Sequence, residues 1–200
     1  MDNFYSNLSE VLSYSGKDYK DAASKMCDRY PDFSLLSQVD GAVISELCGE
    51  KYSAMIRLLA AIAGRRICDN FKFGRPHTEE EIIEFLTAYY LDIVNETVLV
   101  LPLDKKGCVI AAEEVVEGTV NFSGVITRKL LEIMIKYKSK SAILVHNHPG
   151  GKAKLSLEDI ETTRIVSELL RSSDMRLVCH YVVAGKDVAK LDPETCETNI

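Results

Sequence analysis

Apolar residues recur at helical spacing through the first 73 residues, and this pattern predicts a helical region. The clearest stretch is 51–68, whose apolar positions fall on one helix face: Met55, Leu58, Leu59, Ile62 and Ala63. The same spacing predicts helices over 18–30, 33–38 and 42–47, and Pro31 follows the first of them as a stop signal. This region contains no histidine, and nothing in it indicates catalytic chemistry.

The pattern changes after Pro76, where strands begin to alternate with helices. Thr78-Glu-Glu-Glu81 has the form of a capping box and predicts a helix that ends near Leu91. A hairpin is predicted next, with strands over 96–103 and 108–117 joined by a turn at 104–107. Further helices are predicted over 126–138 and 157–172, and further strands over 141–146 and 176–184. This alternation predicts an α/β fold for the C-terminal part.

Charge is distributed unevenly and changes at the same place as the hydrophobic pattern. Residues 1–75 hold ten acidic and ten basic residues, whereas residues 76–200 hold twenty acidic and fourteen basic ones, which accounts for the net charge of −6. We take the Gly-Arg-Pro-His stretch at 74–77 as the boundary between a helical region, 1–75, and a second domain, 78–200. The net charge disfavours strong, charge-driven DNA binding.

Composition and cysteine use favour a cytoplasmic protein. The longest apolar runs, such as Leu58–Ala63, are far shorter than the ~20 residues of a bilayer span. The first ten residues have neither the basic nor the apolar segment of a secretory signal. The six cysteines form no CxxC pair, so we expect reduced thiols and not a disulfide framework.

The stretch from His146 to Asp159 holds the candidate chemistry. His146 and His148 are two residues apart at the end of a predicted strand, so both imidazoles lie on one side of the sheet. A glycine-rich turn then leads to Ser156 and Asp159 at the start of the next helix, and Asp159 is predicted as a third ligand. Three such ligands predict an open Zn²⁺ site, although iron, cobalt and nickel also bind imidazole with carboxylate. The alternatives are that the histidines are surface or packing residues and that Ser156 and Asp159 only cap the helix.

A hydrolytic site of this kind also needs a general base. Glu96 is one candidate, because it stands at the start of an apolar strand where a polar residue needs a reason. From periodicity alone, a solvated strand end explains Glu96 better. Glu113, Glu114 and Glu117 on the second strand are further candidates, although such a cluster usually marks a solvated face.

The order His146-x-His148, then Ser156 and Asp159, resembles the signature of the JAMM/MPN+ metallopeptidases, and the form HNHP resembles their RadC-like branch. The similarity extends over roughly 78–190 and includes Glu96–Asp104, Gly118-Thr-Val120 and Ser141–His146. It implies a cytidine-deaminase-like α/β/α core, with Zn²⁺ bound by both histidines and Asp159. It further implies that Glu96 is the base and that Ser156 stabilises the tetrahedral intermediate.

The resemblance implies hydrolysis of an amide or isopeptide bond in a peptide or protein substrate. It leaves open two alternatives, a DNA-repair-associated module and a protein-interaction module whose metal is not catalytic. Residues 27–72 resemble a helix-hairpin-helix region, but Leu47–Lys51 holds one glycine, and Glu50 adds negative charge where a phosphate would bind. This departure argues against DNA binding. The substrate and the oligomeric state stay open.

Overall fold

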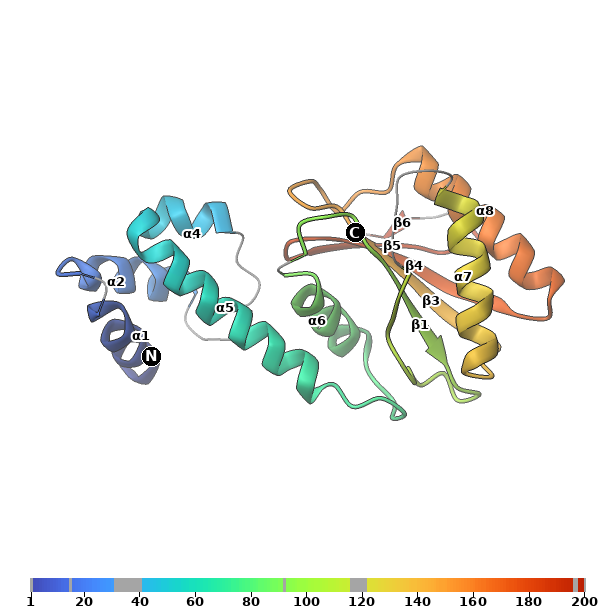
Figure 1. Ribbon diagram of the computed structural model, residues 1–200, viewed down its shortest axis with the longest axis horizontal. Helices are drawn as coiled ribbons and strands as arrows, with labels where there is room; N and C mark the ends of the chain where they lie inside the picture. Colours follow the sequence, from blue (N-terminus) through green and yellow to red (C-terminus); the bar gives the residue numbers. More distant parts are fainter. Residues whose placement is uncertain are drawn as a thin grey trace. The chain divides into compact units, whose positions relative to one another are not determined.

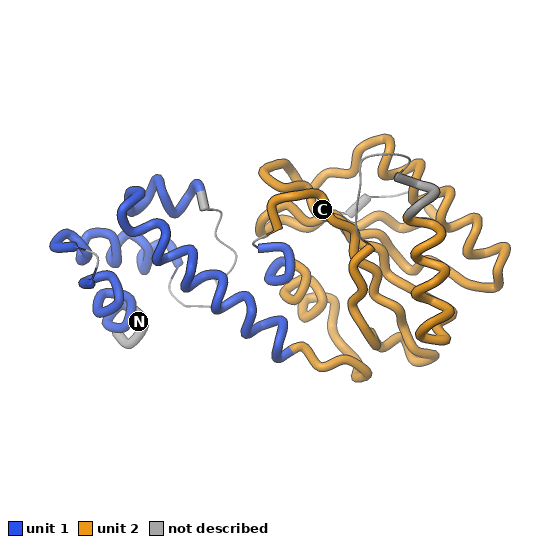
Figure 2. The backbone as a smooth tube through the Cα atoms, viewed as in Figure 1, with its two compact units in different colours: residues 1–70, 87–92 blue, residues 71–86, 93–200 orange. Residues whose placement is uncertain are grey.

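The computed structural model describes residues 2–14, 16–30, 41–91, 93–115, 122–195 and 198–199. The chain divides into two compact units, one formed by 1–70 and 87–92 and the other by 71–86 and 93–200 (Figure 2). Among the described residues, no helix has both the length and the apolar character needed to cross a membrane. The predicted helix over 33–38 lies outside the described residues.

The first unit is helical, as its periodicity predicts. Its helices are α1 (Asp2–Ser13), α2 (Tyr19–Arg29), α4 (Gly41–Cys48) and α5 (Glu50–Asn70). They enclose one apolar cluster that includes Leu8, Leu12, Met26, Ile44 and Ile56. Gly49 joins α4 to α5 with φ of 75°, a left-handed conformation that glycine adopts without steric cost. Helix α1 was not predicted.

The second unit is built on a six-stranded sheet with the order β2-β1-β3-β4-β5-β6 (Figure 1). Strands β3 and β4 run parallel, and the other neighbouring pairs are antiparallel. The bounds are β1 Val98–Leu103, β2 Glu113–Val115, β3 Ser141–Asn147, β4 Arg176–Ala184, β5 Asp187–Leu191 and β6 Thr198–Asn199. Strand β4 has its predicted bounds, whereas β5 and β6 were not predicted.

Helices cover both faces of this sheet, which confirms the predicted α/β fold with a helical N-terminal region. Helices α7 (Phe122–Lys136) and α8 (Leu157–Ser172) pack on one face through a cluster that includes Leu130, Leu144, Val166 and Leu170. Helix α6 (Glu79–Tyr89) begins on the other face, where Glu79 accepts hydrogen bonds from Tyr181 and Lys190. The predicted capping box at Thr78 and Glu81 is present.

The predicted hairpin is present, but its second strand begins at Glu113, later than the predicted start at Cys108. Asp104 closes the turn, because its carboxylate accepts hydrogen bonds from the N–H groups of Lys106 and Cys108. Val100 pairs with Glu113, and Leu103 bridges to Val109. Between these two pairs, the second strand of the hairpin therefore contains one more residue than β1. An extra residue interrupts the ladder, and regular pairing resumes only at Glu113–Val115.

Strand β4 contains a one-residue register shift that determines which side chains face the helices. Ala142 pairs with Leu177, but Ile143 pairs with Cys179, so Val178 is an extra residue on β4. Leu177 belongs to the cluster under α7 and α8, and His180, three residues later, also faces α8. Without the shift, strict alternation would place Leu177 and His180 on opposite faces.

Candidate metal centre

Strand β3 and helix α8 bring the candidate ligands together. His146 lies near the end of β3, and the N–H of His148 continues the pairing by donating to the carbonyl of Val183, 2.8 Å away. The chain then turns at Gly150, whose φ is 67°. After the loop it enters α8, which carries Asp159 in its first turn.

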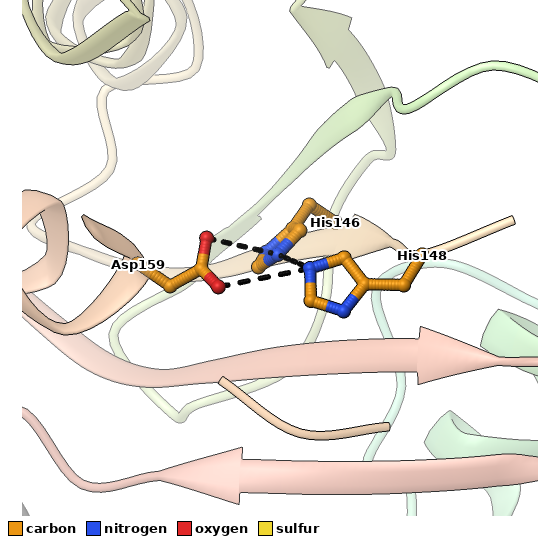
Figure 3. A group of neighbouring side chains, drawn as sticks. All are labelled: His146, His148 and Asp159. Atoms are coloured by element: carbon orange, nitrogen blue, oxygen red, sulfur yellow. Dashed lines mark hydrogen bonds and ion pairs between the residues drawn. The ribbon is translucent and has the colours of Figure 1, made fainter. Parts of the chain in front are cut away.

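His146, His148 and Asp159 form a compact group at this edge of the sheet (Figure 3). The two Nε2 atoms of the histidines are 2.9 Å apart. His146 Nε2 lies 3.2 Å from Asp159 Oδ1, and His148 Nε2 lies 3.6 Å from Asp159 Oδ2. Ligands of one zinc ion at about 2.0–2.2 Å are no more than ~4.4 Å apart, so the two Nε2 atoms and the carboxylate of Asp159 fit a single ion. The group therefore fits a metal site.

The three side chains of the group differ in how deeply they are buried. The His146 side chain is 4% exposed, whereas Asp159 is 12% and His148 20% exposed. Solvent therefore reaches the group from the side of His148 and Asp159. This access suits a site at which water or a substrate takes the remaining position.

Asp159 is held as a carboxylate. Burial raises its pKa, but the hydroxyl and N–H of Ser156, which both donate to Oδ2, lower it. The lowering contributions prevail, so the pKa of Asp159 lies well below its usual value. An ionised carboxylate is the form that binds a metal.

Ser156 caps α8. Its hydroxyl oxygen accepts from the N–H of Asp159, and its own N–H donates to Asp159 Oδ2 at 2.7 Å, which completes a capping box. The Ser156 hydroxyl also donates to Asp159 Oδ2, 2.7 Å away. The capping role suggested by the sequence is therefore present, and stabilisation of an oxyanion by Ser156 stays a prediction.

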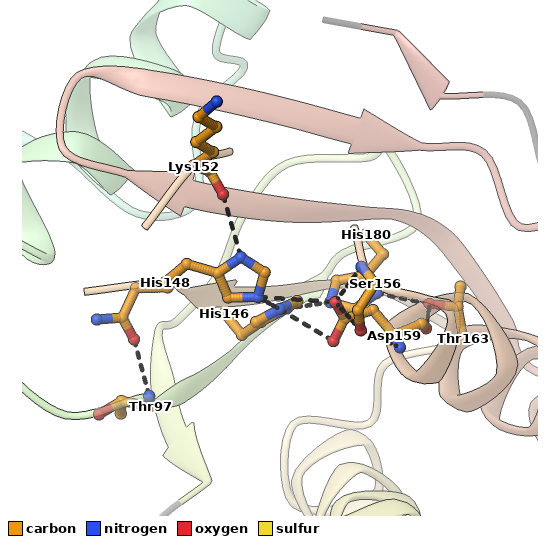
Figure 4. A network of polar contacts seen from close by, with 9 residues as sticks. Thr97, His146, His148, Lys152, Ser156, Asp159, Thr163 and His180 are labelled. Atoms are coloured by element: carbon orange, nitrogen blue, oxygen red, sulfur yellow. Dashed lines mark hydrogen bonds and ion pairs between the residues drawn. The ribbon is translucent and has the colours of Figure 1, made fainter. Parts of the chain in front are cut away.

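Each histidine has a partner on the ring nitrogen that faces away from Asp159 (Figure 4). His148 Nδ1 lies 3.2 Å from the carbonyl oxygen of Lys152. A carbonyl only accepts, so Nδ1 of His148 carries the proton and its Nε2 presents a lone pair to the group. His146 Nδ1 lies 2.8 Å from Nε2 of His180, and His180 Nδ1 lies 2.6 Å from the hydroxyl of Thr163.

Glu96 lies in the segment that enters β1, where Val98 is the register partner of His146. Its side chain is exposed, and it is not part of the ligand group. Asn147 holds this segment at the sheet edge: its Oδ1 accepts from the N–H of Thr97 at 2.7 Å. Its Nδ2 donates to the carbonyls of Ile93 and Asn95 at 3.3 and 3.1 Å. The backbone of Glu96 is thus fixed near the histidines, and its role as base stays a prediction.

The other candidate bases differ in their surroundings. Glu113 accepts hydrogen bonds from Lys136, 2.7 Å away, and from the hydroxyl of Tyr137, both on or next to α7. Glu114 is exposed on β2. Glu117 and the Gly118-Thr-Val120 segment lie outside the described residues.

Sequence reasoning missed the supporting side chains Asn147, Thr163 and His180, all of which are buried. The sequence held a signal for Asn147, because a polar residue between two predicted ligands needs a hydrogen-bond partner. His180 stood in a predicted apolar strand and also needed a partner. Thr163 offered no signal, since threonine is ordinary on a helix.

Comparison with known proteins agrees with this architecture. The model of the RadC-like JAB domain matches residues 77–194, and the chain belongs to this family. A UPF0758 protein of Legionella pneumophila is 31% identical over 147 residues, which are 70% of this chain and 64% of that protein. A UPF0758 protein of Herminiimonas arsenicoxydans is 29% identical over 74% of this chain and 66% of its own length. Another from Cupriavidus taiwanensis is 25% identical over 92% and 81%. None of these names specifies a reaction.

Proposed function

We propose that this protein is a metal-dependent hydrolase of peptide or isopeptide bonds, with Zn²⁺ bound by His146, His148 and Asp159. The convergence of the three ligand residues, with contacts of 2.9, 3.2 and 3.6 Å between their ligand atoms, is the observation that supports the proposal. Two imidazoles with one carboxylate are a donor set that suits zinc. The free thiols on Cys27, Cys48, Cys68, Cys108 and Cys179 support a cytoplasmic location.

In this proposal the bound metal supplies Lewis acidity, which acidifies a water molecule and polarises the amide carbonyl. Glu96 takes the proton from the attacking water and later gives it to the leaving amine. Ser156 donates its hydroxyl to the developing oxyanion, for which it leaves its hydrogen bond with Asp159. Asn147 holds the backbone on both sides of Glu96.

A groove of about 1230 Å³ adjoins Ser156 and offers a place for the substrate chain. Its apolar lining includes Leu155, Ile160 and Val188. Lys152, Lys154 and Lys186 line it against the single carboxylate of Asp187, which leaves two positive charges. Apolar and acidic side chains next to the scissile bond match this lining, so we expect peptides of that composition to be the better substrates.

Metal content is the first test. Purified protein is expected to hold about one zinc-type ion per chain by elemental analysis, and His148→Ala is expected to lose it. Full metal occupancy in His148→Ala would refute the ligand set.

Turnover is the second test and uses a matched pair of variants. Glu96→Gln is expected to bind zinc like the parent and to lose ~10²–10⁴-fold in rate on an amide substrate. Glu114→Gln, which changes an exposed glutamate on β2, is expected to keep parental activity. Activity that survives Glu96→Gln would refute this base. A zinc-loaded parent that hydrolyses no member of a broad peptide library would favour a non-catalytic interaction module.

A further inference from the structure

Thr163 and His180 connect two of the candidate ligands through the interior of the protein. Thr163 lies on α8 and is 1% exposed, and His180 lies on β4 and is 3% exposed. The Thr163 hydroxyl donates to the backbone carbonyl of Asp159, 2.6 Å away. Figure 4 shows the chain of contacts from this hydroxyl through His180 to His146.

The direction of each hydrogen bond follows from counting protons. A threonine hydroxyl has one hydrogen, and Thr163 donates it to the carbonyl of Asp159, which only accepts. Its contact with His180 Nδ1, at 2.6 Å, therefore requires His180 Nδ1 to be the donor. The proton of His180 is thus placed on Nδ1.

A neutral imidazole with a proton on Nδ1 has an accepting Nε2. His180 is enclosed in the protein interior, where an imidazolium without a carboxylate partner is strongly disfavoured. Its Nε2 then accepts from Nδ1 of His146, 2.8 Å away. This places the proton of His146 on Nδ1 and leaves Nε2 of His146 bare, facing Asp159 and His148.

We propose that Thr163 and His180 are positioning residues that select the Nδ1-protonated tautomer of His146 and so keep its Nε2 available for metal. The proposal rests on the metal site of the proposed function but not on its hydrolytic activity. His148 is held in the same tautomer by a backbone carbonyl, which can only accept a hydrogen bond. The tautomer of His146 instead depends on a series of hydrogen bonds between side chains. The Thr163 hydroxyl determines which atom donates in each of them.

Zinc affinity of the full chain, measured by competition with a chromophoric chelator, tests the proposal. Thr163→Val keeps the shape but removes the hydroxyl, and we expect zinc affinity to fall by ~10–100-fold, the usual effect of losing such a partner. Thr163→Ser restores the hydroxyl and is expected to bind like the parent. Thr162→Val, at the neighbouring buried threonine of α8, is the matched control and is expected to leave affinity unchanged.

Long-range ¹H–¹⁵N NMR of the metal-free protein reads the tautomer directly. We expect the Nδ1-protonated pattern for His146 in the parent and in Thr163→Ser, and its loss in Thr163→Val. Parental affinity with an unchanged His146 pattern in Thr163→Val would overturn the proposal. Equal losses of affinity in Thr163→Ser and Thr163→Val, or a matching loss in Thr162→Val, would overturn it in favour of a packing role. A parent that binds no zinc would refute the metal site itself.

Discussion

Replacement of Asn147 by alanine removes the side chain that holds the Glu96 segment against the sheet. Asn147 is 3% exposed and makes three hydrogen bonds, one to Thr97 N–H and two to the carbonyls of Ile93 and Asn95. At about 0.5–1.5 kcal/mol for each bond, the loss sums to about 1.5–4.5 kcal/mol. The histidine ligands are anchored by β3 itself, so zinc affinity is expected to change little.

Amide hydrogen exchange at Thr97 measures this effect where it occurs, because that N–H is bonded to Asn147 Oδ1. A local loss of about 1.5–4.5 kcal/mol corresponds to exchange faster by roughly 10- to 1600-fold, at tenfold for each 1.4 kcal/mol. Turnover is expected to fall together with Thr97 protection, because the segment that carries Glu96 is released.

Asn147→Asp separates the donor from the acceptor function of the amide. It keeps an oxygen for Thr97 N–H but presents a second oxygen to the carbonyls of Ile93 and Asn95, so we expect it to be less stable than Asn147→Ala. Asn95→Ala changes an exposed side chain in the same segment and serves as the control. Thr97 exchange that stays within threefold of the parent in Asn147→Ala would refute the reasoning.

Two further predictions concern charge. Because the folded-state pKa of Asp159 lies below its unfolded value of about 3.9, the folded metal-free protein holds fewer protons in acid. The contribution of Asp159 to stability is complete above about pH 5 and is lost as the pH falls through 4 and below. The thermal unfolding temperature of Asp159→Asn is therefore expected to change less with pH than that of the parent, and identical profiles would contradict this. In the groove, Lys154→Glu combined with Lys186→Glu is expected to lower kcat/KM for acidic peptides by roughly two- to thirtyfold, since two exposed ion pairs at about 0.2–1 kcal/mol each are lost. An equal loss on neutral peptides would show that the lysines do not select charge.

Local patterns predicted most of the regular elements. Helix α8 begins and ends as predicted, because its capping box and apolar periodicity both lie within the segment. Helix α1 was missed because few of its positions contact the core, with Leu8 and Leu12 fully buried. Strand β5 was missed because five residues after the turn at Gly185 are too few for a periodic signal.

The ligand group could also be predicted from the sequence, because its members lie close together along the chain. His146 and His148 share a strand end, and Asp159 follows one loop later, so the spacing alone brings them to one edge. The contact between His146 and His180 joins residues 34 positions apart. It depends on the pairing of β3 with β4 and on the extra residue at Val178, and these are set by tertiary packing.

The extra residue at Val178 divides β4 into two halves of opposite parity. Odd-numbered Leu177 faces α7 and α8 in the first half, and even-numbered His180 and Val182 face α8 in the second. A chain that lacked Val178 would pair Leu177, Cys179 and His180 with three consecutive residues of β3, so regular alternation would keep Leu177 and His180 on the same face. The exposed Val178, outside both the apolar cluster and the hydrogen-bond chain, is thus a position at which β4 can lose one residue and still direct Leu177 and His180 to the same face.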